Sequence, residues 1–367
     1  MSISGFLNNI ESRFENGTSK SVLSEAGDLL FDAAYDGLNQ VKGRLLKKVY
    51  DGQIPRFSDT SDNVRNSQSA GNDYVGGGDF NQSTMVDGRH RDYLLHVPPS
   101  YDGKKDMPLV VALHGRGDDA SDIAKLTSLS KKADEEGFIV AYPNATKWFG
   151  KKSLAAWDTD NGLIPPGADS NDVQLIDRII DRAKSDLSID FDRVHLVGFS
   201  NGGMLAYLAA SEAKNRIASI AVVAGSMSGD EVAPPAPVSI LSINGTLDAI
   251  IPVAGLEVPC DISGLILPTL KPQAYVRDFW KNSIGANEEP TVSKQGSAVV
   301  ESFRNSTTGA ELKSILINGG SHDWPGAERT KSRPYDPDSQ FDATRAIWDF
   351  FQSHPKADEP PLDIRSA

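Results

Sequence analysis

From about residue 84 onward, short apolar segments alternate with longer segments in which apolar residues recur every three or four positions. The short segments predict strands at Arg91–Val97, Leu109–Leu113, Phe138–Tyr142, Val194–Gly198, Ile220–Ala224, Val238–Asn244 and Leu312–Ile317. The longer segments predict helices at Ile123–Glu136, Asp172–Leu187, Gly202–Ala213, Gln273–Ser283 and Ala343–Ser353. Strands that alternate with helices predict an α/β fold: a mainly parallel twisted sheet flanked by helices.

The alternation of predicted strands and helices is less regular toward the C-terminus. Val299–Phe303 directly precedes the last predicted strand, so we expect it to be an antiparallel or irregular addition. Residues after Pro355 are rich in proline and charge, which predicts a loose tail at residues 358–367. We therefore place one α/β domain at residues 84–357.

Residues 1–83 have a different texture and are predicted to be an N-terminal extension. Within Ser21–Tyr50, apolar residues at helical spacing predict an amphipathic helix that packs on the main domain or on another subunit. Acidic residues in its first half disfavour a membrane-surface helix. Arg56–Gln82 is predicted to be a linker. Gly71–Asp79 resembles one copy of a calcium-binding Gly/Asp repeat, but such repeats need neighbours to build each site.

Composition narrows the class of protein. The 367 residues are 39% hydrophobic and 24% charged, as expected for a globular protein with a sizeable core. The net charge of −13 gives no footprint for nucleic-acid binding. A single cysteine, Cys260, excludes an intrachain disulfide and is expected to be a small buried residue. No Sec signal or membrane-spanning run is evident, so we expect a cytoplasmic protein or one exported by another route.

A candidate nucleophile lies between a predicted strand and a predicted helix. Gly198-Phe199-Ser200-Asn201-Gly202 matches the G-x-S-x-G motif. The sharp turn presents the serine hydroxyl at the end of the sheet, and the following helix directs its N-terminus toward developing negative charge. We therefore expect Ser200 to be the nucleophile of a serine hydrolase. An inert serine in a structural turn is the alternative.

A serine nucleophile needs a base and an orienting carboxylate. His322 follows the last predicted strand, whereas the other five histidines lie within strands, at element edges or in the loop after Leu109–Leu113: His90, His96, His114, His195 and His354. Asp248 follows the strand Val238–Asn244, and the order Ser200, Asp248, His322 is that of α/β-hydrolases. Weaker candidates for the carboxylate are Asp261, Asp278 and Asp323.

Two backbone N–H groups are also needed to hold the oxyanion. One is expected from Asn201, directly after the nucleophile. The other is expected from Arg116, in the His114-Gly115-Arg116-Gly117 loop that follows a predicted strand. His114 is then structural.

Residues from about 88 to 353 resemble the bacterial poly(3-hydroxybutyrate) depolymerase and feruloyl-esterase-like family of α/β-hydrolases. The resemblance is carried by five stretches: residues 93–98 (YLLHVP), 108–115 (PLVVALHG), 137–143 (GFIVAYP), 200–204 (SNGGM) and 319–326 (GGSHDWPG). It implies the same triad and the same oxyanion loop. Arg116 stands where many members have cysteine, and residues 1–80 have no counterpart.

The resemblance implies an ester hydrolase that works through an acyl-enzyme, without metal or cofactor, on polyhydroxyalkanoate, other polyester or feruloyl-type esters. Three tryptophans, Trp148, Trp157 and Trp324, are candidates for an aromatic substrate platform or for packing. Ile251–Pro272 is expected to line the acyl pocket or act as a lid. The expected partner is an ester, polymeric or not, and a homo-oligomer through the N-terminal helix is conceivable. Alternatives are an acetylxylan esterase, a peptidase of the same fold and a non-catalytic binding protein.

Overall fold

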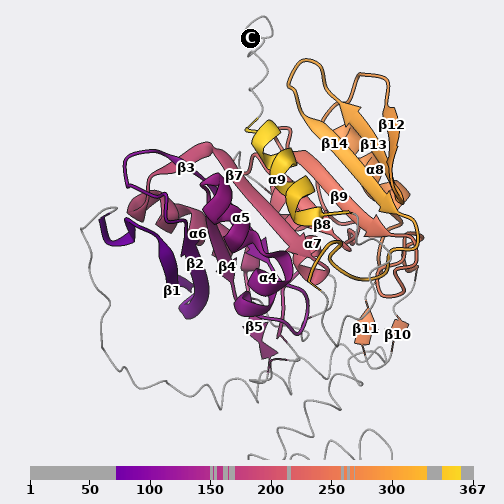
Figure 1. Ribbon diagram of the computed structural model, residues 1–367. Helices are drawn as coiled ribbons and strands as arrows, with labels where there is room; N and C mark the ends of the chain where they lie inside the picture. The colour runs from indigo at the N-terminus through magenta and orange to yellow at the C-terminus, as the bar shows by residue number, and fades with distance from the viewer. Residues whose placement is uncertain are drawn as a thin grey trace, which may run out of the picture.

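The structure is a computed structural model that describes residues 72–148, 152, 155–159, 164, 170–212, 216–257, 260–262, 265–267, 269–328 and 341–356 (Figure 1). The predicted helix within Ser21–Tyr50, the first part of the predicted linker and the predicted tail at 358–367 lie outside the described residues. So does the side chain of Cys260. No helix within the described ranges is long and apolar enough to cross a membrane.

A ten-stranded sheet forms the centre of the domain. Its strands from β4 to β14 run parallel, and antiparallel strands extend the sheet at both edges. Their order across the sheet is β1 (Gly78–Val86), β2 (Arg89–Val97), β4 (Ile139–Pro143), β3 (Met107–Leu113), β7 (Ile189–Phe199), β8 (Ser219–Val223), β9 (Ser239–Gly245), β14 (Glu311–Ile317), β13 (Ala298–Arg304) and β12 (Thr291–Gln295).

Helices cover both faces of the sheet (Figure 1). One face carries α4 (Ala120–Thr127), α5 (Leu129–Glu136) and α9 (Ala343–Ser353), and the other carries α6 (Asp172–Asp186), α7 (Asn201–Glu212) and α8 (Gln273–Ser283). Each face has its own apolar core. Every residue of β3, β8 and β9 is buried, as expected for parallel strands that are covered on both sides. The prediction of a mainly parallel sheet between helices is confirmed.

Smaller elements surround this core. A 3-10 turn, η1 (Asn72–Tyr74), precedes β1. Two short antiparallel pairs, β5 (Thr146–Lys147) with β6 (Ala155–Ala156) and β10 (Cys260–Ile262) with β11 (Leu265–Leu267), lie in loops that follow parallel strands. The antiparallel addition predicted at Val299–Phe303 is β13, which pairs with β14.

The single helix predicted at Ile123–Glu136 is wrong, because the structure divides it into α4 and α5. Ser128 adopts a left-handed conformation with φ 52°, which interrupts the helical backbone between them. The chain also begins α4 earlier than predicted, since Asp119 and Asp122 form a reciprocal capping box there. Turn and cap chemistry therefore overrode the apolar periodicity.

The predicted linker is wrong from Gly78 onward, where the chain forms β1 and pairs with β2 along its whole length. Alternate side chains, among them Phe80, are partly buried, whereas their neighbours such as Asn81 and Ser83 are exposed. A strand with one solvated face has a polar composition similar to that of a loop. The sheet therefore starts before the expected domain boundary at residue 84.

A buried histidine in β7 is predicted to make the fold sensitive to acid. His195 lies against the ring of Phe351 and shares a 2.8 Å hydrogen bond with Ser219 Oγ. Burial lowers the pKa of His195 from 6.5 to about 3, and the nearby Arg193 adds to this effect. Between these two values the unfolded chain binds a proton that the folded chain does not.

We therefore expect the contribution of His195 to stability to be complete above about pH 6.5 and to fall as the pH approaches 3, by an amount on the order of 4 kcal/mol. The free energy of unfolding should be measured by urea titration at several pH values. In His195→Asn, whose side chain does not titrate, the dependence on pH should be flatter across this window. An unchanged slope would contradict the assignment.

Candidate active site

The motif around Ser200 forms a tight turn from the end of β7 into α7. Ser200 adopts a positive φ of 55°, an unusual conformation for a serine, and its N–H donates to the Val223 carbonyl at 2.9 Å. A Cβ at Gly198 would overlap the Gly202 backbone, and one at Gly202 would overlap the carbonyls of Leu113 and His114. Only glycine fits at these two positions, so the sequence of the motif follows from the close approach of α7 to β7 and β3.

The structure brings Ser200, His322 and Asp248 together in one hydrogen-bonded chain. His322 Nε2 lies 2.9 Å from Ser200 Oγ, and its Nδ1 lies 2.8 Å from Asp248 Oδ2. The Asp248 side chain is fully buried, while the His322 side chain remains 18% exposed. Because a carboxylate accepts hydrogen bonds, Nδ1–H donates to Asp248, which leaves Nε2 to accept the serine hydroxyl proton.

Backbone hydrogen bonds fix the carboxylate of Asp248 in the loop after β9. Asp248 Oδ1 accepts from the N–H groups of Ile250 and Ile251, both at 2.8 Å. With Oδ1 held in this way, Oδ2 faces His322. An acceptor whose lone pairs are satisfied by backbone donors tolerates burial that would be costly for an unpaired charge.

The Asp248 loop and the His322 loop are also bound to each other. The N–H groups of Thr246 and Leu247 donate to the carbonyls of Ile317 and Gly320, at 3.0 and 2.8 Å. The Gly319 N–H donates in turn to the Thr246 hydroxyl at 2.9 Å. These contacts follow directly from the parallel pairing of β9 with β14, whose carboxyl ends lie side by side.

Aromatic packing orients the imidazole. The ring of Phe199 lies 5.2 Å from that of His322 and 6.4 Å from that of Trp324. The Trp324 indole N–H donates to Thr344 Oγ1 of α9 at 3.0 Å, and that hydroxyl donates to the Thr127 carbonyl at 2.6 Å. The loop that carries His322 is therefore anchored to the helices on one face of the sheet.

The two expected oxyanion donors lie on either side of the nucleophile turn. Asn201 is the first residue of α7, and the first N–H groups of a helix have no intrahelical carbonyl to bond. Arg116 lies in the loop after β3. Its neighbour His114 is fully buried and takes no part in the triad.

Both ring nitrogens of His114 bond to backbone groups in the loops after β3 and β4. Nε2 accepts from the Ala145 N–H at 3.0 Å, so Nδ1 carries the proton and donates to the Gly115 carbonyl at 2.7 Å. Burial lowers the pKa of His114 to about 4, so the ring is neutral at neutral pH. The structural role expected for His114 agrees with these bonds.

The three candidate substrate tryptophans are buried, with Trp148 3%, Trp157 0% and Trp324 1% exposed. These three side chains therefore do not form an exposed aromatic platform. The ring of Trp324 packs edge-on against Phe199 at 6.4 Å, and that of Trp157 lies against the ring of His114 at 4.7 Å. The sequence places these residues in loops at the correct edge of the sheet, but it does not indicate whether a loop residue points inward.

An aliphatic cluster, of which the sequence indicated only the segment Ile251–Pro272, lies beside the triad. Met204, Ile251 and Leu270 are buried together, with the partly exposed Ile250 and Leu256 packed against them. The Met204 N–H donates to the Ser200 carbonyl, one helical turn away. Ile251 belongs to the segment that binds the Asp248 carboxylate. The segment Ile251–Pro272, expected to line the acyl pocket, thus contributes two of the buried members.

The other candidate groups lie outside the triad. Asp323 Oδ1 accepts from the Trp324 N–H at 2.8 Å, Asp261 lies in β10 and Asp278 lies in α8. His195 is buried in β7, and His354 bonds to Glu311 at 3.0 Å. Within the described ranges, no group of three His, Cys, Asp or Glu side chains is arranged to hold a metal ion.

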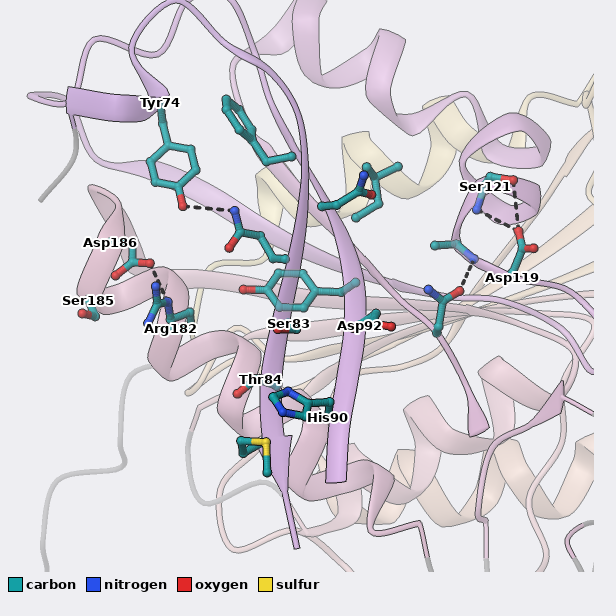
Figure 2. Close-up of a pocket in the computed structure, with 18 of the residues that line it drawn as sticks. Tyr74, Ser83, Thr84, His90, Asp92, Asp119, Ser121, Arg182, Ser185 and Asp186 are labelled. Atoms are coloured by element: carbon teal, nitrogen blue, oxygen red, sulfur yellow. Dashed lines mark hydrogen bonds and ion pairs between the residues drawn. The ribbon is translucent and has the colours of Figure 1, made fainter. Parts of the chain in front are cut away.

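A pocket of about 1660 Å³ lies against the β1–β2 hairpin (Figure 2), and none of its lining residues belongs to the triad. Two of the carboxylates that line it, Asp119 and Asp186, already have partners. Figure 2 shows Asp186 beside Arg182 and Asp119 beside Ser121. The ion pair between Arg182 Nε and Asp186 Oδ2 is 2.6 Å long. Asp119 also pairs with Lys152 at 2.7 Å. We assign no chemistry to this pocket.

Comparisons with known proteins agree with this architecture. A family model described as "Esterase PHB depolymerase" matches residues 91–263. The putative esterase NocK of Nocardia uniformis subsp. tsuyamanensis is 31% identical over 273 residues, which cover 70% of this chain and 76% of that protein. A probable feruloyl esterase C of Aspergillus flavus is 30% identical over 184 residues, covering 47% of this chain and 62% of that protein.

Among solved structures, acetyl xylan esterase from Aspergillus awamori superposes with a TM-score of 0.50 at 16% identity. The match covers 73% of this chain and 99% of that one. At this level of identity the similarity shows the fold alone, which is the α/β-hydrolase fold.

Proposed function

This chain belongs to the esterase PHB depolymerase family and is a carboxylic ester hydrolase, and we propose that it acts through a Ser200–His322–Asp248 triad and an acyl-enzyme. The observation that carries the proposal is the hydrogen-bonded chain from Ser200 Oγ through the imidazole to Asp248. A buried carboxylate, a partly exposed base and a strained serine turn support it.

The proposed reaction has two halves. His322 Nε2 takes the Ser200 proton while Oγ attacks the ester carbonyl, and Asp248 stabilises the imidazolium that forms. The imidazolium then gives that proton to the departing alkoxide, so the alcohol leaves and the acyl group stays on Ser200. Water repeats the cycle: His322 takes its proton, the hydroxide attacks the acyl carbonyl, and the proton returns to Ser200.

The developing oxyanion would be held by the backbone N–H groups of Arg116 and Asn201. The N-terminus of α7 adds a favourable partial positive charge at the same place. Donors of this kind stabilise the tetrahedral state more than the planar ester, which is what accelerates the reaction.

For the substrate, we favour an aliphatic acyl group of the hydroxyalkanoate type over a feruloyl group. The apolar cluster beside Ser200 and Asp248 is aliphatic, with the partly exposed Ile250 and Leu256 at its surface. The indoles that could have stacked on an aromatic acid are buried. Because similar proteins are named as feruloyl and acetyl xylan esterases, feruloyl and acetyl esters are the substrates with which the aliphatic ester should be compared.

We expect kcat/KM to be about tenfold or more higher for p-nitrophenyl butyrate and 3-hydroxybutyrate oligomers than for methyl ferulate, because an aliphatic wall offers no stacking surface. Acetylated xylan and a peptide amide of matched acyl group complete the panel. A preference for ferulate would contradict the aliphatic assignment. Turnover of the peptide at rates matching the ester, or no turnover of any ester, would contradict the proposed function.

A further inference from the structure

A buried segment, Ala155–Trp157, lies between the two parts of the chain that carry the expected oxyanion donors. All three of its residues are no more than 1% exposed. One part is the loop after β3 that contains Arg116. The other is the first turn of α7, which contains Asn201. These parts are far apart in the sequence, so their separation depends on contacts that reach across from one to the other.

Trp157 makes hydrogen bonds to both parts. Its indole N–H donates to the His114 carbonyl at 2.7 Å, on the oxyanion loop. Its backbone N–H donates to Asn201 Oδ1 at 2.8 Å, on α7. Two residues earlier, the Ala155 carbonyl accepts from the Gly117 N–H at 2.8 Å, which adds a second bond to the loop.

The segment is itself fixed to the scaffold. The N–H of Asp158, the next residue, donates to Asp172 Oδ2 at 2.7 Å. Asp172 Oδ1 pairs with Arg91 of β2 at 2.6 Å, and both side chains are buried. Arg91 also donates to the carbonyls of Ser170 and Asn144. Ala155–Trp157 is thus fixed to the scaffold through Asp172 and Arg91, and it bonds to both parts of the chain that carry an expected oxyanion donor. We call this segment the brace.

We propose that Trp157 is a positioning residue that sets the distance between the backbone N–H groups of Arg116 and Asn201. The inference rests on the proposed function, because it assigns these two groups to the oxyanion. Trp157 is too deeply buried to touch the substrate, so it acts only through the two parts that it joins. Oxyanion donors are effective within a narrow range of positions, since a displacement of about 1 Å can cost on the order of 100-fold in rate.

The test is Trp157→Phe, which keeps a large aromatic ring and removes the indole N–H. The matched control is Trp348→Phe, because Trp348 is also buried, at 3% exposed, and its indole N–H has no partner within the described ranges. With p-nitrophenyl butyrate we expect Trp157→Phe to lower kcat by about 10- to 100-fold, with KM changed less than about twofold. Trp348→Phe should retain the wild-type kcat.

A second readout separates positioning from general damage. An aliphatic trifluoromethyl ketone forms a tetrahedral adduct with the serine, so its inhibition constant should rise by the factor that kcat/KM falls. The midpoint of the pH dependence of kcat/KM should be the same in Trp157→Phe as in the wild type, because the variant leaves the triad unchanged. A kcat for Trp157→Phe within twofold of Trp348→Phe, or a loss of kcat without weaker ketone binding, would overturn the inference.

A second variant covers the case in which Trp157→Phe does not fold. Asn201→Ala keeps the backbone N–H of residue 201 but removes the Oδ1 that bonds to Trp157, and it should lower kcat and ketone affinity together. Wild-type values for this variant would also overturn the inference. The proposed function is tested separately, by the loss of turnover in Ser200→Ala. If Trp157 proves not to position the two N–H groups, the proposal of the triad is therefore unaffected.

Discussion

Replacing Ser200 with alanine is expected to lower kcat for p-nitrophenyl butyrate by a factor on the order of 10⁴ to 10⁶. Alanine removes the oxygen that we propose forms the acyl-enzyme, and it leaves His322 Nε2 without the hydroxyl that lies 2.9 Å away. The oxyanion donors and the binding site remain, so a small residual rate over water is expected. Substrate binding should change little, which is checked by the affinity of a non-reactive amide analogue.

The control is Ser211→Ala on the same helix, α7, where the hydroxyl donates to the Leu208 carbonyl at 2.8 Å. Ser211→Ala should hydrolyse the ester at the wild-type rate. A fluorophosphonate should label the wild type and Ser211→Ala at Ser200, located by peptide mass spectrometry, and should not label Ser200→Ala. Undiminished turnover by Ser200→Ala would rule out the mechanism.

Replacing Asp248 with asparagine should be the second large effect, a loss of about 10⁴-fold in kcat. The N–H groups of Ile250 and Ile251 would hold the amide oxygen in the place of Oδ1. The amide NH₂ would then face His322 Nδ1. Because an NH₂ group only donates, Nδ1 would have to accept its hydrogen bond and could not carry the imidazole proton. With the proton moved to Nε2, the imidazole can no longer accept the hydroxyl proton of Ser200.

Asp323→Asn is the matched control for this substitution, because Asp323 adjoins the same histidine in sequence. Its Oδ1 accepts the Trp324 N–H at 2.8 Å, an interaction that an asparagine oxygen can keep. We expect kcat within about threefold of the wild type. Comparable losses in both variants would mean that the two carboxylates share the role, contrary to the assignment.

Strong local patterns made much of the fold predictable. The helices Gln273–Ser283 and Ala343–Ser353 begin and end in the structure at the predicted residues, because apolar periodicity coincides there with polar boundaries. The triad candidates could be proposed because each follows a predicted strand, and parallel strands bring their carboxyl ends to the same edge of a sheet. Chain order then restricted the choice among six histidines.

Features that depend on tertiary contacts were not predictable. The break at Ser128 depends on a backbone conformation that serine rarely adopts, and β1 alternates between a polar outer face and a half-buried inner one. Trp157 and Trp324 contact residues around the candidate site, on the sides of Asn201 and Phe199. Which way each indole points depends on partners such as His114 and Thr344, which lie far away in the sequence.

The pairing of β1 with β2 bears on how this protein behaves when shortened. Among the strands that the structure describes, β1 is the outermost at its edge, and Asp79 within it bonds to His96 of β2 at 2.7 Å. His96 bonds on its other side to Asp134 of α5 at 3.1 Å. A chain cut at residue 84 would leave β2, with its run of aromatic and aliphatic residues, as an open edge. Such an edge recruits other chains, so the shortened enzyme would be prone to self-association in storage while its catalytic groups stayed intact.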